Sequence, residues 1–237
     1  MEIQKSEANG VTTFTTEFYG RPLIVEVGRL ANQANGSCTV RFGETVVLAT
    51  AVMAGAARDG INYFPLTVDY EERLYAAGII KGSRWVKREG RPSDEVVQTS
   101  RLVDRSLRPL FPKGLQNDVQ VIITVLSFDQ HNDPDAISIL AASIAVAISP
   151  IPWDGPIAGL RMGRIGSATE PRTYEWAVNP TIAAREKSDL DLIVAGTGER
   201  VVMVEAGAHE VSEAVISEAI ASAAKPLLAV QAGRPPI

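Results

Sequence analysis

The chain has 237 residues, of which 46% are hydrophobic and 6% aromatic, and its formal net charge is −5. A single cysteine excludes an internal disulfide and a cysteine metal cluster, and two distant histidines argue against a zinc site. The sequence has neither an apolar run of transmembrane length nor a signal peptide at its polar N-terminus, so we expect a cytoplasmic protein with no membrane partner.

β-Branched residues and short alternating runs predict that the first half of the chain is mostly sheet. Gly43-Glu44 is a two-residue hairpin connection with glycine first, and Cys38 alternates with apolar neighbours, which predicts a buried strand residue. A long loop is expected over residues 73–92. The strands predicted before it are 12–18, 23–27, 37–42, 45–53 and 65–70.

The second half mixes helices and strands. Ser93 is a predicted N-cap for a helix that ends near residue 107, before two prolines. A nearly continuous apolar run predicts a strand over 119–128 that is buried on both faces, and an apolar helix is expected over 135–148. Further strands are predicted at 157–165, 174–178, 190–195 and 200–206, followed by an amphipathic helix over 210–223. We therefore predict one α+β core domain, residues 1–225, and a C-terminal tail, residues 226–237, that leads to domains absent from this sequence.

Positive charge is concentrated between residues 81 and 113, where nine basic and four acidic residues give +5. Because the whole chain carries −5, the other 204 residues carry −10. Such segregation is typical of a surface that meets a polyanion, and Trp85 among the cations suits base stacking on single-stranded nucleic acid. A solvated basic helix is the alternative. Arg101, Arg105 and Arg108 share one helix face, where they contact a phosphate backbone or form a structural ion-pair network.

Few catalytic signatures are present. The sequence has no phosphate-binding loop of the G-x-x-x-x-G-K-[ST] type, and no serine in a G-x-S-x-G elbow. Asp189 and Asp191 are separated by one residue on a predicted strand, which would place both on one face. Such a pair can hold Mg²⁺, although acids that keep a strand end soluble are commoner.

Four segments nevertheless strongly resemble the first core domain of bacterial polynucleotide phosphorylases. They are FPLTVDYEERLYAAGIIKGS (64–83), REGRPSDEVVQTSRLVDRSLRPLFPKG (88–114), NDPDAISILAASIAVAISPIPWDGPI (132–157) and SDLDLIVAGTGERVVMVEAGAHEVSE (188–213). The resemblance covers essentially the whole chain. It implies the ribonuclease PH fold, an α+β fold of the ribosomal protein S5 domain 2 type with mixed sheets and packed helices.

The same resemblance implies an activity for the whole enzyme. In that family two such domains per chain form trimers around a central RNA channel. Inorganic phosphate attacks the 3′-terminal linkage of RNA and releases a nucleoside diphosphate, with Mg²⁺ assisting. The expected partners are thus single-stranded RNA, a second core domain and the other subunits of a homotrimer, and no DNA is expected.

Residue by residue, the resemblance argues against catalysis in this domain. Asp191 matches one catalytic carboxylate of the family, but Arg185 stands where the other belongs and Ile193 where the catalytic lysine belongs. The segment 132–135 (Asn-Asp-Pro-Asp) places carboxylates where relatives hold phosphate, and these would repel an anion. An arginine cannot hold Mg²⁺ and an isoleucine cannot neutralise developing charge. No catalytic residue and no bound metal are therefore expected here, and Asp189 and Asp191 are vestigial candidates.

The RNA-binding loop does carry over. In the family, an aromatic and arginine-rich loop of the first core domain lines the channel constriction and grips single-stranded RNA. Arg84, Trp85, Lys87 and Arg88 occupy that place, and Arg91 matches an arginine that contacts phosphate in catalytic domains. Two functions remain open. One is the RNA-guiding half of a phosphorolytic exoribonuclease whose chemistry lies in a missing second core domain. The other is a non-catalytic RNA-binding or assembly module that is complete as given.

Overall fold

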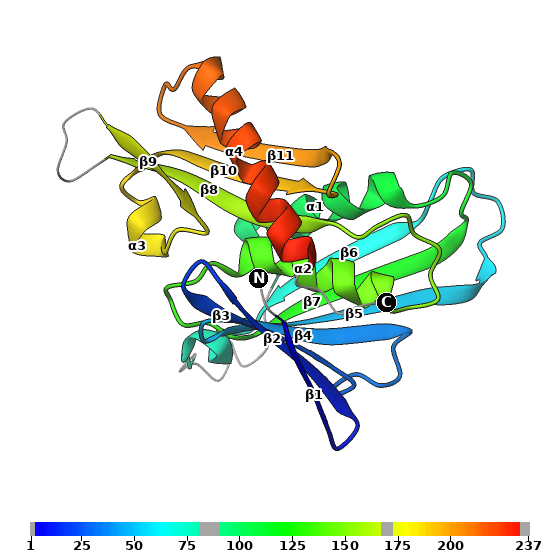
Figure 1. Ribbon diagram of the computed structural model, residues 1–237. Helices are drawn as coiled ribbons and strands as arrows, with labels where there is room; N and C mark the ends of the chain where they lie inside the picture. The colour runs from blue at the N-terminus through cyan, green and yellow to red at the C-terminus, as the bar shows by residue number, and fades with distance from the viewer. Residues whose placement is uncertain (1–2, 81–90, 167–172, 233–237) are drawn as a thin grey trace.

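The computed structural model describes residues 3–80, 91–166 and 173–232. The first sheet contains β1 (Gln4–Ala8), β2 (Val11–Phe18), β3 (Arg21–Val27), β4 (Gly36–Phe42), β5 (Thr45–Ala57), β6 (Leu66–Glu72) and β7 (Asn117–Ser127). The second contains β8 (Ala158–Gly166), β9 (Tyr174–Val178), β10 (Ser188–Gly196) and β11 (Val201–Ala208). The helical elements are η1 (Leu74–Ala77), α1 (Asp94–Leu107), η3 (Arg108–Leu110), α2 (Pro134–Ala147), α3 (Ile182–Arg185) and α4 (Glu213–Ala232) (Figure 1).

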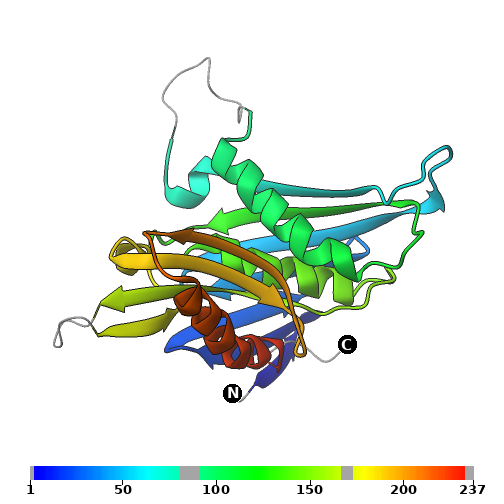
Figure 2. The ribbon, with the colours of Figure 1, turned by 90° about the horizontal axis from the view of Figure 1, so that it is seen from above.

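The two sheets enclose a layer of helices. The larger sheet has the order β1-β2-β3-β4-β5-β7-β6 and the smaller one β11-β10-β8-β9. Helix α2 packs on β4 and β5 on one side and on β8 on the other, which explains why it is apolar all round (Figure 2). Two glycines let the backbones approach. A Cβ at Gly36 would lie 2.1 Å from the carbonyl oxygen of Ala145, and one at Gly159 would lie 2.6 Å from Ile139. The prediction of a buried helix here is confirmed.

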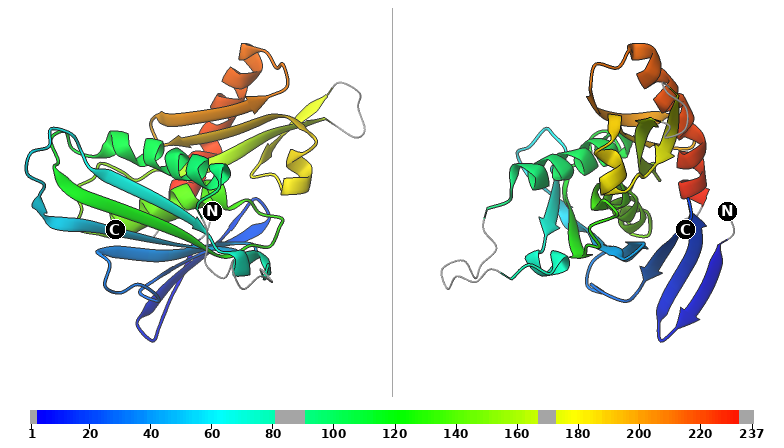
Figure 3. Two further views of the ribbon diagram at one scale, coloured as in Figure 1. Left: turned by 180° about the vertical axis from the view of Figure 1, so that it is seen from behind. Right: turned by 90° about the vertical axis from the view of Figure 1, so that its left-hand side faces the viewer.

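Helix α1 is the crossover between two parallel strands, β6 and β7, and packs against β6. The Ser93 hydroxyl accepts a hydrogen bond from the backbone N–H of Val96 at 3.3 Å, so the predicted N-cap is confirmed. The buried face of α1 carries Leu102, Val103 and Leu107. This crossover brings the start of α1 beside the end of β6, as the views of Figure 3 show.

Helix α4 covers the outer face of the smaller sheet, where it contacts β8, β9 and β10 (Figures 1 and 2). The sequence predicted that this helix ends near residue 223, but it continues past Pro226 to Ala232. Leu227 is 2% exposed, and burial of this side chain favours the additional turns. The helix therefore crosses the boundary that we expected between core and tail.

Other expectations about local structure were partly wrong. Strand β7 is buried on one face only, because its neighbours β5 and β6 are covered by helices on that side; Gln120 on the other face is exposed. β1 and the short helix α3 were not predicted. The hairpin at Gly43-Glu44 is confirmed by the pairing of Phe42 with Thr45, and Cys38 is buried, which raises its pKa to about 12. Within the described residues, no helix is long and apolar enough to cross a membrane. The α+β class is confirmed.

Candidate functional site

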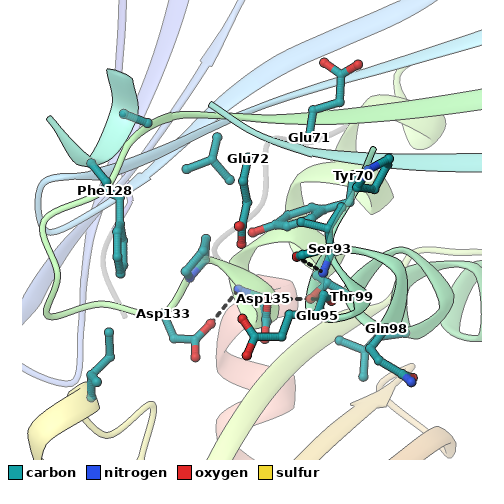
Figure 4. A pocket seen from close by; sticks show the side chains of 18 of the residues that line it. Tyr70, Glu71, Glu72, Ser93, Glu95, Gln98, Thr99, Phe128, Asp133 and Asp135 are labelled. Carbon is teal, nitrogen blue, oxygen red and sulfur yellow. Dashed lines mark hydrogen bonds between the residues drawn. The ribbon is translucent and has the colours of Figure 1, made fainter. Parts of the chain in front are cut away.

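A groove of about 960 Å³ lies where the two sheets and the helix layer meet. Its walls come from the end of β6, from η1, from the start of α1, and from β10 and β11 of the smaller sheet. The N-terminus of α2 forms part of its base (Figure 4). The groove thus gathers residues from distant parts of the sequence, including the segment 132–135 and Asp191.

The start of α2 places two carboxylates in the groove. Asp133 is the N-cap of the helix, and its Oδ1 accepts a hydrogen bond from the backbone N–H of Asp135 at 2.9 Å. Pro134 occupies the first turn, where its missing N–H costs nothing. The Thr99 hydroxyl of α1 donates to Asp135 Oδ1 at 2.9 Å, which ties the two helices together at this point (Figure 4).

A buried arginine holds these carboxylates. Arg161 lies on β8, and its side chain is 7% exposed. Its Nη1 donates to both carboxylate oxygens of Asp191, at 2.8 and 2.6 Å, and its Nη2 donates to Asp135 Oδ2 at 3.0 Å. The same Nη2 lies 3.3 Å from Asp133 Oδ2. Arg185 also bonds to Asp133, and its Nε lies 4.0 Å from Asp191. Two guanidiniums therefore face three carboxylates.

Burial governs the electrostatics of this cluster. Burial and, to a smaller extent, the nearby Asp133 carboxylate raise the pKa of Asp135 to about 7, against the opposing effects of Arg161 and Thr99. Burial alone would lower the pKa of Arg161, but Asp133, Asp191 and Asp135 together raise it. Arg161 thus remains charged, and Asp135 is the group that titrates near neutral pH.

The two predicted vestigial carboxylates are separated. Asp191 binds Arg161, whereas Asp189 forms an ion pair with Arg164, three residues further along β8. A β-bulge between Ser188 and Asp191 shifts the pairing of β10 with β8 by one residue. The two aspartates therefore bind different arginines, and the structure does not bring them together as a pair. Asp189 is not among the residues that line the groove.

The residues of the groove do not fit Mg²⁺ or phosphate. Both oxygens of Asp191 are bound by the Arg161 guanidinium, whose positive charge beside them disfavours a metal cation. Within the described ranges, no group of three or more His, Cys, Asp and Glu side chains is arranged to hold a metal ion. Among the residues that the structure describes, seven carboxylates and four arginines line the groove, a formal charge of −3 that disfavours an anion. They are Glu71, Glu72, Glu95, Asp133, Asp135, Asp191 and Glu205, and Arg73, Arg91, Arg161 and Arg185.

Of the predicted RNA-binding residues, Arg84, Trp85, Lys87 and Arg88 lie outside the described residues. Arg91 is exposed at the edge of the groove.

The arginines of α1 are placed more definitely. Arg105 pairs with Glu205, and Arg108 donates to Asp104 from Nε and Nη2, at 2.9 Å each. Arg108 also bonds to the carbonyl oxygens of Phe64 and Leu66. For Arg105 and Arg108, the geometry therefore favours a structural ion-pair network over contact with a phosphate backbone. The guanidinium of Arg101 is exposed and has no partner among the residues that the structure describes.

The chain matches two family models along most of its length. The model for the 3′ exoribonuclease family, domain 1, matches residues 19–152, and that for domain 2 matches residues 155–225. The chain belongs to the 3′ exoribonuclease family. This confirms the resemblance found in the sequence, and the fold is the ribonuclease PH fold.

The similar proteins are much longer than this chain. It is 53% identical over 208 residues to a polyribonucleotide nucleotidyltransferase of Exiguobacterium sibiricum. The aligned region covers 88% of this chain and 27% of that relative. The corresponding protein of Herpetosiphon aurantiacus is 53% identical over 210 residues, or 89% and 26% of the two chains. The chain therefore spans about a quarter of the length of these curated relatives.

Two solved structures share the fold at low sequence identity. Rice Rrp46 has a TM-score of 0.70 at 14% identity and covers 90% of this chain and 92% of its own. A chain of the Archaeoglobus fulgidus exosome, solved with RNA bound to the active site, has a TM-score of 0.64 at 16% identity and covers 89% and 87%.

The sequence analysis brought Asp133, Asp135, Arg185 and Asp191 to one place correctly but overlooked Arg161. The signal was a single arginine in the middle of the otherwise apolar strand segment Ala-Gly-Leu-Arg-Met-Gly. A charged residue at such a position is buried only when it is paired.

Proposed function

We propose that this chain is the RNA-guiding part of a phosphate-dependent 3′→5′ exoribonuclease and does not itself carry the chemistry. One observation supports the second half of this proposal above all: Arg161 binds both carboxylate oxygens of Asp191, the residue that the resemblance matches to a catalytic carboxylate of the family. A chain-borne guanidinium cannot exchange with a metal or a substrate, so it removes the positions that phosphoryl transfer requires.

In this proposal the catalytic centre lies in a second core domain of the longer protein, which holds Mg²⁺ there and assembles as a cytoplasmic homotrimer that degrades mRNA. The relatives are more than three times as long as this chain, which leaves room for such a domain. The basic segment 81–113, with its charge of +5, contacts the RNA backbone, and Trp85 stacks on bases.

The test measures RNA binding by the chain and by a Trp85→Ala/Arg88→Ala variant. Each stacked base contributes about 1–3 kcal/mol and each phosphate contact adds about one unit of salt slope. We expect the variant to bind an RNA oligomer at least tenfold more weakly, with a smaller salt dependence. The matched control is Tyr63→Ala/Arg58→Ala, which removes an exposed aromatic side chain and an exposed arginine. Both residues precede the start of β6, whereas the groove lies at the end of that strand. Equal affinity of the loop variant and the wild type would refute the RNA-guiding role.

A second measurement addresses the chemistry. The purified chain is incubated with poly(A), phosphate and Mg²⁺, and the release of nucleoside diphosphate is followed. We expect no turnover from the chain and turnover from a longer form that contains the second core domain. Sustained turnover by the chain that disappears in Asp191→Asn would contradict the proposal. If the longer form is also inactive but binds RNA, the alternative of a non-catalytic RNA-binding module is favoured.

A further inference from the structure

Two carboxylates at the rim of the groove have no cationic partner. Glu72 is the last residue of β6, Glu95 lies in the first turn of α1, and both are exposed. No described residue donates a hydrogen bond or an ion pair to either side chain. Partial burial, Glu95 and Asp133 all raise the pKa of Glu72, as expected when carboxylates face one another without compensation. In Figure 4 the side chains of Glu72, Glu95 and Asp133 converge on the same space.

A buried hydroxyl faces the same space. Tyr70 lines the groove and is only 3% exposed, and its hydroxyl has no hydrogen-bond partner among the described residues. The hydroxyl points toward the Glu72 carboxylate in Figure 4. Burial, together with the negative charges of Asp135, Glu72 and Asp133, raises the pKa of Tyr70, so the group is a neutral donor and acceptor. A buried polar group without a hydrogen-bond partner costs free energy. The Tyr70 hydroxyl is therefore a second indication of a ligand, in addition to the rim carboxylates.

Size and charge define what the groove can take. At about 960 Å³ it is far larger than a metal ion needs, and its carboxylates are not grouped for one. The formal charge of −3 on its described lining residues disfavours a phosphate or an RNA backbone. Arg161 and Asp135, which are largely buried, form its floor, and the exposed Glu72 and Glu95 stand at its rim. A ligand must therefore be an organic cation with enough length to reach from rim to floor.

We propose that this groove binds a small organic polycation with two or more ammonium groups, of the di- or polyamine class. Glu72 and Glu95 balance its charge, because Asp133 is already paired with Arg185, and the Tyr70 hydroxyl accepts a hydrogen bond from an ammonium group. The groove borders the basic segment, with which it shares Arg91 and Glu95, but the proposal does not rest on RNA guidance. Two ammonium groups are required because the rim and the floor carry separate acceptors.

Calorimetric titration of the purified chain with spermidine and with putrescine, at low ionic strength and pH 7.5, tests the site. We expect saturable binding of one spermidine per chain. Glu72→Gln/Glu95→Gln should weaken it at least tenfold, and Tyr70→Phe about fivefold, since a hydrogen bond to a charged group contributes about 1.5–3 kcal/mol in buried sites and less near solvent. Both variants should melt cooperatively, because removing rim carboxylates relieves repulsion.

The matched control is Glu17→Gln/Glu175→Gln, which changes the net charge equally at two exposed carboxylates outside the groove. It should keep the wild-type affinity for spermidine. An equal loss in the control and the groove variant would show unspecific charge attraction and overturn the proposal, as would the absence of saturable binding. N-acetyl-lysine amide, which has one ammonium group, should bind at least tenfold more weakly; equal affinity would refute the need for a polycation. Saturable binding of inorganic phosphate would refute the assigned charge preference.

Discussion

Replacing Arg161 by methionine tests how much the buried ion cluster stabilises the fold. The substitution keeps the apolar stem but removes the guanidinium, whose side chain is 7% exposed and which contacts three carboxylates at 2.6–3.3 Å. Removing one partner of a buried ion pair leaves uncompensated charge and costs about 3–5 kcal/mol. For a chain of this size that loss corresponds to a fall in Tm of roughly 6–20 °C.

The assay is urea unfolding followed by circular dichroism at pH 7.5 and at pH 4.5. The loss should be smaller at pH 4.5, because Asp135 is protonated there and no longer needs a cation. The matched control adds Asp133→Asn, Asp135→Asn and Asp191→Asn to Arg161→Met. Asparagine caps a helix as well as aspartate does, so this uncharged cluster should recover most of the lost stability. A loss below about 1 kcal/mol for Arg161→Met alone, typical of a surface ion pair, would refute the buried cluster.

Two further predictions follow from burial. Asp135 has a folded-state pKa of about 7, above its value in an unfolded chain, so the folded protein keeps a proton that the unfolded one has lost between about pH 4 and pH 7. Stability should therefore fall as pH rises through this window, and Asp135→Asn should flatten the urea profile there by up to about 4 kcal/mol; an unchanged slope would contradict the assignment. Ile144 of α2 is 3% exposed, and Ile144→Asp should abolish soluble folding, whereas Ile144→Val should cost about 0.5–1.5 kcal/mol. A soluble aspartate variant that melts cooperatively would show that this helix is not core.

Local signals in the sequence located most elements of the fold. The start of α1 was predictable because Ser93 and the acidic first turn act within a few residues of one another. β9 was predicted with its observed bounds. β1 was not, because its five residues are all exposed and polar or small, and they form a strand through pairing with β2. The end of α4 was missed because burial of Leu227 in the folded chain, and not a local signal, favours the additional turns.

The candidate site was predictable only in part for the same reason. The resemblance located Arg185 and Asp191, and the structure places both beside Asp133. The bulge in β10 that separates Asp189 from Asp191 depends on the pairing with β8, which no local pattern encodes. Arg161 likewise acquires its role only when β8 and β10 are adjacent and α2 begins beneath them. Charge pattern indicated a polyanion partner, but it did not indicate that the groove would be acidic.

The groove and the basic segment carry formal charges of opposite sign. The segment 81–113 carries +5, whereas the groove lining carries −3, and Arg91 belongs to both. A polyanion near the chain is drawn to the basic residues and repelled from the groove. At physiological ionic strength the two fields act over about 8 Å, so each decides only what binds directly on it. A groove that holds Arg161 and is lined by carboxylates does not compete with the basic segment for RNA, which is what the proposed RNA-guiding role requires.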